Sequence, residues 1–176
     1  MVNALYIAAE IAQIFPCDER PETTEGYEGF YHLNDLNGNV ESARMDYIIR
    51  DHDREKFEAK KEFFKAAIEK INEKYDGRVS LELKDQYYSM KEQVLPVKFI
   101  VDMVEEAMKE LEIEPLIIPI RGGTDGAMLS YKGLPCPNIF TGGLNFHGKN
   151  ECIPVSAMEK ASQLVVRIAE KFAARA

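Results

Sequence analysis

Hydrophobic residues recur at helical spacing in four stretches of the chain, at residues 4–15, 53–75, 97–111 and 156–172. Each stretch places apolar side chains three or four positions apart, which predicts a helix with one buried face. Pro16 ends the first helix, and a capping box of Ser156 and Glu159 is expected to begin the last one. Only Asn3 is available to cap the first helix, so its beginning suggests a truncated chain.

Shorter apolar or alternating runs predict strands, at residues 29–36, 40–50, 79–83, 116–120 and 137–141. Asn37-Gly38 lies between the first two runs and predicts a hairpin turn. In the second run Met45, Tyr47 and Ile49 share an apolar face. Arg50 therefore belongs to the opposite, polar face, at the end of the strand.

The order of these elements predicts an α/β fold in two parts. Helix, two strands, helix and strand in residues 1–92 would form a partial ferredoxin-like domain, an antiparallel sheet with two helices that lacks its first strand. Residues 93–176 alternate strands with helices, which indicates a parallel or mixed sheet.

Composition and charge exclude some classes of protein and leave the predicted fold unchanged. The 176 residues are 45% hydrophobic and 30% charged, an ordinary globular balance. A net charge of -8 argues against general attraction to nucleic acid or anionic membranes. No apolar run approaches the roughly 20 residues of a membrane span, and no signal peptide follows Met1. We therefore expect a cytoplasmic protein.

The three cysteines lie far apart in the sequence, at Cys17, Cys136 and Cys152. Their odd number and spacing argue against a disulfide framework, and a zinc knuckle is excluded. Small, buried, reduced thiols are expected instead.

A Gly-rich turn, from Ile120 to Gly126, leaves an apolar run and enters a predicted helix. Ligands gather beyond the carboxyl ends of strands in α/β sheets, and Arg121 can bind a carboxylate through two hydrogen bonds. The turn lacks the Gly-Lys-Ser/Thr ending of a phosphate-binding loop. A tight turn with Thr124 or Asp125 as helix cap is an equal alternative.

A second Gly-rich loop, residues 141–151, contains His147. A neutral imidazole is a common zinc ligand, but a zinc site needs three or four protein ligands, and only Glu151 is nearby. A surface histidine is the alternative. A third segment, from Ile48 to Asp53, fits a charged strand exit followed by a helix cap.

Several stretches together resemble the peptidase T family, the aminotripeptidases of the dizinc exopeptidase superfamily. They are TEGYEGFYHL, YIIRDHDREKFEAKK, DQYYSM, PIRGGTDGAMLSYKGLPCPNIFTGGLNFHGKNE and MEKASQLVVRIAE. They run in family order along the whole chain.

The resemblance implies an α/β catalytic domain that carries two zinc ions and is interrupted by a smaller lid. Residues 1–92 would be a lid and dimerisation domain without its first strand, and residues 93–176 the C-terminal segment of the catalytic domain. The chain would be a C-terminal fragment of a zinc-dependent tripeptide aminopeptidase, inactive alone. The remaining metal ligands and the general base would lie in a preceding portion, so no catalytic residue is expected here.

The resemblance also implies individual roles. His147 matches a metal ligand. Arg121 matches an arginine that binds the carboxylate of a short peptide substrate, and Thr124, Asp125 and Gly126 would shape that pocket. Arg50 matches a lid arginine that reaches the substrate.

Two other functions stay open. A non-catalytic module could form a homodimer through the lid, or bind a partner such as the missing N-terminal part. A phosphate-binding transferase is the weaker choice, because the turn lacks the lysine and the metal-binding serine or threonine that end the phosphate-binding motif.

Overall fold

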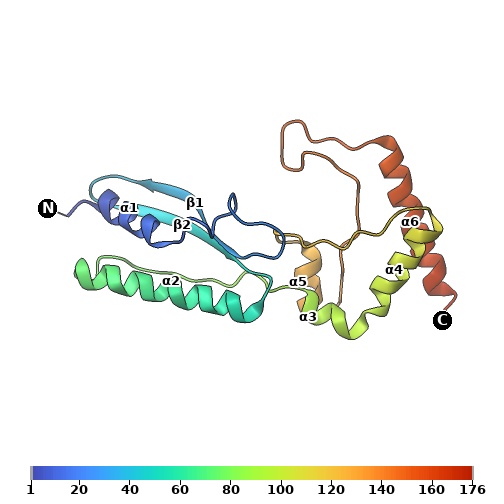
Figure 1. Cartoon of the computed structure of the whole chain (residues 1–176), viewed down its shortest axis with the longest axis horizontal. Helices are drawn as coiled ribbons and strands as arrows, with labels where there is room; N and C mark the ends of the chain where they lie inside the picture. Colours follow the sequence, from blue (N-terminus) through green and yellow to red (C-terminus); the bar gives the residue numbers. More distant parts are fainter. Residues whose placement is uncertain (1, 176) are drawn as a thin grey trace. The chain divides into compact units, whose positions relative to one another are not determined.

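The structure, a computed structural model, describes residues 2–175, and its elements fall into two units (Figure 1). The first unit contains the chain up to Ser89 together with Pro119–Gly122. The second contains Met90–Ile118 and the chain from Gly123 onward.

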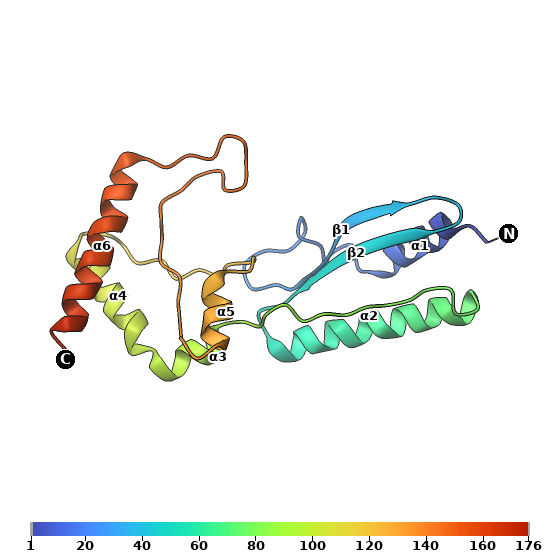
Figure 2. The same cartoon turned by 180° about the vertical axis from the view of Figure 1, so that it is seen from behind.

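The first unit is a β-hairpin with two helices on one face. Its elements are α1 (Ala4–Ile14), β1 (Phe30–Gly38), β2 (Ala43–Arg50) and α2 (Arg54–Lys74), with the strands antiparallel (Figure 2). Met45, Tyr47 and Ile49 pack against the buried cluster that both helices share with the sheet. The predicted hairpin, its apolar face and both helices are therefore confirmed.

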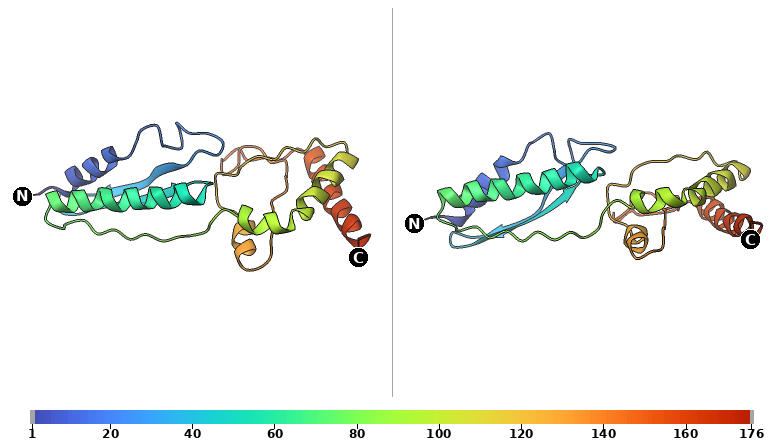
Figure 3. Two further views of the ribbon diagram at one scale, coloured as in Figure 1. Left: turned by 60° about the horizontal axis from the view of Figure 1, so that its bottom comes forward. Right: turned by 90° about the horizontal axis from the view of Figure 1, so that it is seen from below.

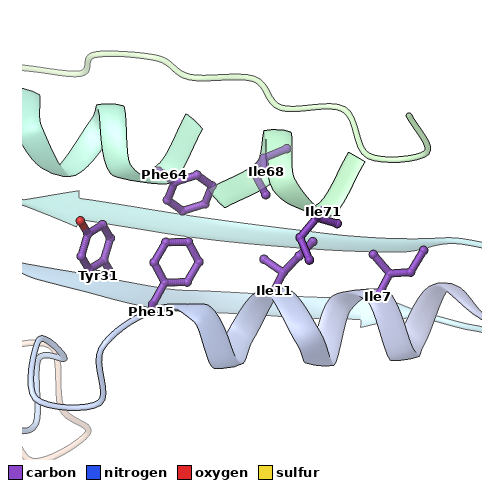
Figure 4. Packing of buried hydrophobic residues seen from close by; sticks show 7 residues of the cluster. All are labelled: Ile7, Ile11, Phe15, Tyr31, Phe64, Ile68 and Ile71. Carbon is purple, nitrogen blue, oxygen red and sulfur yellow. The ribbon is translucent and has the colours of Figure 1, made fainter. Parts of the chain in front are cut away.

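The core of the first unit lies between the two helices (Figure 4). Ile7 and Ile11 of α1 face Ile68 and Ile71 of α2, as their helical spacing predicts. Phe15 follows α1, and its ring centroid lies 4.6 Å from Phe64, 5.0 Å from Tyr31 and 5.0 Å from Tyr47. The aromatic cluster fixes the end of α1 against the sheet and against α2.

Both helices of the first unit begin at a polar cap. The Asn3 side chain accepts a hydrogen bond from the Leu5 N–H at 2.9 Å, and Asp53 accepts one from Lys56 at 3.0 Å. Such bonds satisfy backbone donors that a helix leaves open at its start. Asn3, the one cap candidate that the sequence offered for α1, therefore performs this role.

The hairpin turn lies two residues beyond the predicted one. Asn37 and Gly38 still pair with β2, and the turn spans Asn39 to Ser42. The Asn39 side chain accepts hydrogen bonds from Glu41 N at 2.8 Å and Ser42 N at 3.1 Å, which closes the turn locally. The strands are longer as a result.

The run at residues 79–83 is extended but joins no strand, contrary to prediction. The Asn72 side chain binds both main-chain groups of Val79. The start of this run is therefore held to α2 instead of to the hairpin.

The second unit is built from helices and long extended segments (Figure 3). The helical elements are α3 (Lys91–Val94), the 3₁₀ turn η1 (Leu95–Val97), α4 (Phe99–Glu110), α5 (Asp125–Tyr131) and α6 (Val155–Ala173). Helices α4 and α6 pack together around Met103, Ala107 and Leu164, and Leu164 is completely buried. Arg167 and Lys171 of α6 form ion pairs with Glu110.

The predicted strands at residues 116–120 and 137–141 do not form among the residues that the structure describes. A strand needs a neighbour for its main-chain hydrogen bonds, and neither run has one there. Leu116, Ile117 and Ile118 are 76%, 69% and 62% exposed. The mixed α/β class is confirmed, but the parallel or mixed sheet expected in the second half is not.

Two further predictions were wrong. Helix α6 begins at Val155 with Pro154 as its N-cap, so Ser156 lies inside the first turn and caps nothing. Cys17 and Cys152 are exposed rather than buried, although all three thiols are free as expected.

Every helix within residues 2–175 is too short or too polar to cross a lipid bilayer.

Candidate functional site

Arg121 is bound by a loop that lies 97 positions earlier in the sequence. Its Nη1 donates to the Thr24 main-chain carbonyl at 2.6 Å, and its Nη2 donates to the Thr24 hydroxyl. The guanidinium carbon lies 4.7 Å from the centroid of the Phe30 ring, a cation–π contact. Thr24 thus binds the two terminal nitrogens of the guanidinium, and the Phe30 ring makes a cation–π contact with it.

The loop that carries Thr24 is itself held by hydrogen bonds. The Thr24 hydroxyl donates to the Arg20 carbonyl at 2.7 Å, and Thr23 donates to the Cys17 carbonyl at 3.1 Å. The Tyr31 N–H of β1 donates to the Glu19 carbonyl at 2.9 Å. Thr24 is therefore a well-ordered acceptor, which suits it to fix the position of a long side chain.

One donor of Arg121 has no acceptor among residues 2–175. Its Nε is buried and makes no hydrogen bond there. Buried donors in proteins nearly always have a partner, because an unpaired one loses its hydration without compensation. The free Nε–H gives the site the capacity to bind one more oxygen atom.

His52 lies close to this guanidinium in the first unit. Burial lowers the pKa of His52, the Arg121 charge lowers it further, and the neighbouring Asp51 carboxylate acts in the opposite direction. The imidazole also makes an edge contact with Tyr27, at 5.2 Å between ring centroids. The neutral imidazole is therefore favoured beside Arg121.

Gly29 permits the close approach of two segments near this site. A β-carbon at Gly29 would lie 2.0 Å from the Asp51 carboxylate and 2.7 Å from the Arg50 carbonyl. Any side chain would separate the beginning of β1 from the end of β2. Glycine is needed at position 29 because the two segments approach closely there, and not because the backbone adopts an unusual φ angle.

Arg50 lies at the end of β2, where the strand pattern placed it. Its guanidinium carbon is 4.6 Å from the centroid of the Tyr87 ring, and burial raises the pKa of Tyr87. No hydrogen bond or ring contact joins Arg50 to Arg121 within the part of the chain that the structure describes. The two predicted substrate residues belong to the same unit without touching each other.

Thr124, Asp125 and Gly126 form the start of α5 in the second unit. The Thr124 hydroxyl accepts hydrogen bonds from Ala127 N at 3.3 Å and from Asn138 Nδ2 at 3.2 Å. Asp125 is the first residue of the helix. Thr124 is therefore the helix cap, the alternative that the sequence had left open beside a role in binding.

Gly126 and Ser130 fix the start of α5 against the following segment. A β-carbon at Gly126 would lie 2.5 Å from the Cys136 carbonyl. The fully buried Ser130 hydroxyl donates to the Gly126 carbonyl at 2.7 Å and accepts from Cys136 N at 2.9 Å. The close approach of Cys136 to Gly126 and Ser130 therefore holds the start of α5 in place.

His147 lies in a loop closed by a bridge between Leu144 and Cys152. Its backbone has a positive φ of 64°, and its N–H donates to the Glu151 carboxylate at 3.2 Å. The residue is exposed. The loop therefore presents an exposed histidine whose main chain is held by the Glu151 carboxylate.

The described residues do not form a metal site by themselves. No group of three or more His, Cys, Asp and Glu side chains within residues 2–175 could hold a metal ion. A zinc ion needs three or four protein ligands. His147 and Glu151 fall short of this number, so the implied zinc ions do not fit the chain alone.

Sequence reasoning missed Thr24 and Phe30 as parts of the site. Both lie in a stretch that carries the family resemblance, but no role was assigned to them. The Thr24–Arg121 contact spans 97 positions, and no periodicity or motif spacing reports a contact of that length.

Comparisons with known proteins agree on one family. Residues 8–171 match the family described as "Peptidase family M20/M25/M40". The chain is 55% identical over 170 residues to a "Peptidase T" from Parabacteroides distasonis, and 54% identical over 175 residues to one from Clostridium acetobutylicum. These matches cover 97% and 98% of this chain but only 42% and 43% of the relatives. The chain thus spans about two fifths of their length and is similar to their C-terminal portion.

Solved structures show the same fold. An aminopeptidase PepT from Bacillus cereus superimposes with a TM-score of 0.73 at 23% identity, covering 98% of this chain and 46% of that one. A tripeptidase from Staphylococcus aureus gives a TM-score of 0.65 at 18% identity, with 95% and 44% covered.

Proposed function

Because the chain belongs to the peptidase family M20/M25/M40, we propose that it supplies the C-terminal portion of a metal-dependent tripeptide aminopeptidase. The observation that carries this proposal is the identity of 53–55% to several peptidase T relatives along nearly the whole chain. Because the match runs along nearly the whole chain, it includes every predicted site residue. A match to one motif would include only a few of them.

Arg121 is proposed to bind the terminal carboxylate of a short peptide. A guanidinium presents donors in a planar fork that matches a carboxylate. Thr24 and Phe30 already fix its position, and its Nε–H lacks an acceptor among the described residues. A peptide carboxylate would supply that acceptor. Arg50, Thr124, Asp125 and Gly126 remain proposed parts of the substrate pocket.

His147 is proposed as one ligand of a zinc site whose other ligands come from a polypeptide equivalent to the rest of the relatives. The exposure of His147 supports this role, because an exposed residue can meet ligands from another polypeptide. The ligand number within the described residues does not allow the chain to bind zinc tightly alone.

The exposed run from Leu116 to Ile118 supports the need for such a polypeptide. A continuous apolar run is typical of a strand buried on both faces of a parallel sheet. Here the three side chains are 76%, 69% and 62% exposed, and no main-chain hydrogen bond of the run occurs among the described residues. We infer that strands of the polypeptide that carries the other ligands lie beside this run.

A non-catalytic module remains the second candidate. The hairpin is a two-stranded sheet among the described residues, so both of its strands have a free side that could pair with a second copy. This function predicts a stable dimer of the chain by light scattering, and a folded monomer would contradict it.

The test is to reconstitute the whole assembly. The chain is co-expressed with the portion of the Parabacteroides distasonis relative that lies outside the matched region, and release of the N-terminal residue from trialanine is measured with zinc. We expect hydrolysis by the purified pair and none by either polypeptide alone. His147→Ala should abolish hydrolysis, and Arg121→Ala should raise KM for trialanine.

Arg78→Ala is the matched control, because Arg78 is an exposed arginine of the same unit. It should leave kcat and KM unchanged. Hydrolysis by the chain alone would contradict the proposed dependence on a second polypeptide. A purified pair without any hydrolysis would contradict the proposed activity.

A further inference from the structure

Thr24 binds Arg121 in a way that leaves one defined edge of the guanidinium free. We propose that Thr24 is a positioning residue that orients Arg121 for the carboxylate of a peptide substrate. The inference rests on the proposed function, because the binding of a carboxylate by Arg121 is itself part of that proposal. Thr24 itself touches no substrate in this proposal and acts through the arginine.

The two hydrogen bonds use the end of the guanidinium. Nη1 donates to the Thr24 carbonyl and Nη2 to the Thr24 hydroxyl, so a single residue occupies the edge formed by both terminal nitrogens. The Pro21 carbonyl lies 3.5 Å from Nη1, at the limit of a hydrogen bond. Two acceptors from one ordered residue fix the rotation of the guanidinium in its own plane.

The Phe30 ring contacts the guanidinium from the sheet. Its centroid lies 4.7 Å from the guanidinium carbon, and Phe30 is buried at the start of β1. The loop therefore supplies the hydrogen-bond acceptors of Arg121, while the sheet supplies a cation–π contact. An arginine free in solvent would have neither constraint.

The edge that stays free is the one a carboxylate needs. The guanidinium fork has a second edge, formed by Nε–H and the remaining Nη2 hydrogen, and it can bind both oxygens of a carboxylate in parallel. The Nε of Arg121 is buried and lacks an acceptor within residues 2–175. Thr24 occupies the end edge, so the side edge is the one left for the proposed carboxylate, which would displace the atoms that cover Nε.

The experiment follows the ¹⁵Nε–H resonance of Arg121 in the full chain during titration with trialanine or with trialanine amide, which lacks the carboxylate. Trialanine should shift this resonance, and the amide should not. Thr24→Val keeps the main-chain carbonyl but removes the hydroxyl acceptor. It should weaken trialanine binding about tenfold, and Thr24→Ser should restore it.

Ser80→Ala is the matched control, because Ser80 is an exposed residue of the same unit and its hydroxyl makes no hydrogen bond within residues 2–175. The Ser80→Ala variant should leave the affinity for trialanine unchanged. A far-ultraviolet circular dichroism spectrum reports whether each variant is folded, and Thr24→Ala serves as a second variant without the hydroxyl.

The outcomes separate the two proposals. If Arg121→Ala binds trialanine as the parent does, or the parent resonance does not move, the carboxylate role in the proposed function is wrong. If Arg121→Ala loses binding while Thr24→Val and Thr24→Ala match the parent, only the positioning role is overturned. A Thr24→Val variant that weakens trialanine and its amide equally also overturns it.

Discussion

The side chain of Asn72 forms a pair of hydrogen bonds with the main chain of Val79. Its Nδ2 donates to the Val79 carbonyl at 2.8 Å, and its Oδ1 accepts from the Val79 N–H at 2.8 Å. These are the groups that a neighbouring strand would otherwise bind. A helix residue therefore holds the beginning of an extended segment, and Val79 packs against the core of the first unit.

Asn72→Ala should lower the free energy of unfolding of the first unit. Both hydrogen bonds are lost and the main-chain groups of Val79 are left half-buried, which costs about 1–3 kcal/mol. Urea denaturation followed by tyrosine fluorescence measures the change. Glu69→Ala, an exposed position of the same helix, is the control and should change the free energy by less than about 0.5 kcal/mol. Equal effects of the two variants would contradict the role of Asn72.

Phe15→Ala should be among the most destabilising single changes in the first unit. The ring is 5% exposed and lies within 5.0 Å, between ring centroids, of Tyr31, Tyr47 and Phe64. Removing it leaves a cavity, at a cost of about 3–5 kcal/mol.

Phe63→Ala is the control for Phe15→Ala, because Phe63 is 44% exposed and lies 6.2 Å from Phe15. Its effect on thermal unfolding should be less than half as large. A smaller loss of stability in Phe15→Ala than in Phe63→Ala would show that Phe15 is not at the centre of the core.

The two adjacent apolar residues Leu164 and Val165 should respond very differently to truncation. Leu164 is 0% exposed between α4 and α6, whereas Val165 is 55% exposed. Leu164→Ala should cost about 2–5 kcal/mol in the second unit. Val165→Ala should cost less than about 0.5 kcal/mol, as surface changes do. Hydrogen exchange of the α6 amides distinguishes them, and similar loss of protection in both variants would refute this orientation of the helix.

His52 should titrate below its ordinary pKa of 6.5, because burial and the Arg121 charge both disfavour the imidazolium. As pH falls below 6.5, the unfolded chain takes up a proton before the folded chain does, so this contribution to stability is present above pH 6.5 and lost on acidification. Removing the charge in Arg121→Gln should raise the pKa of His52. Proton NMR of the imidazole measures this pKa. An unchanged value in Arg121→Gln would show that burial alone controls it.

The isolated chain should bind zinc weakly, whatever the state of His147. The described residues offer no set of three ligands, so calorimetric titration with zinc should give no tight site. His147→Ala should therefore have little effect on zinc affinity in the chain alone, and a large effect in the reconstituted pair. A tight site in the chain alone, lost in His147→Ala, would contradict the ligand count.

The elements that the sequence predicted well are those stabilised by their own local pattern. Helical spacing identified α1 and α2 because each helix buries the face that its apolar residues define. Asp53 was recognised as a cap because the bond it forms lies within the same turn. Helix α6 was found as well, but its N-cap was placed two residues late, since a serine within the first turn resembles a cap in sequence.

The failures concern contacts that local pattern does not contain. Val79 alternates like a strand residue, but a side chain seven positions earlier binds it instead of a neighbouring strand. Leu116 and Ile117 have the composition of a buried strand, yet nothing in the described residues pairs with them. The Gly-rich turn drew attention to Arg121, whereas Thr24 and Phe30 gave no signal because both are distant in sequence.

The run from Leu116 to Ile118 has a consequence for how the chain behaves at high concentration. Three neighbouring branched side chains form an exposed apolar surface through which identical molecules can associate. Such association requires no unfolding of α4 or α6, so the stability of these helices would not prevent it. A strand from a second polypeptide that covered the run would prevent self-association, and the solubility of the chain would then report on assembly.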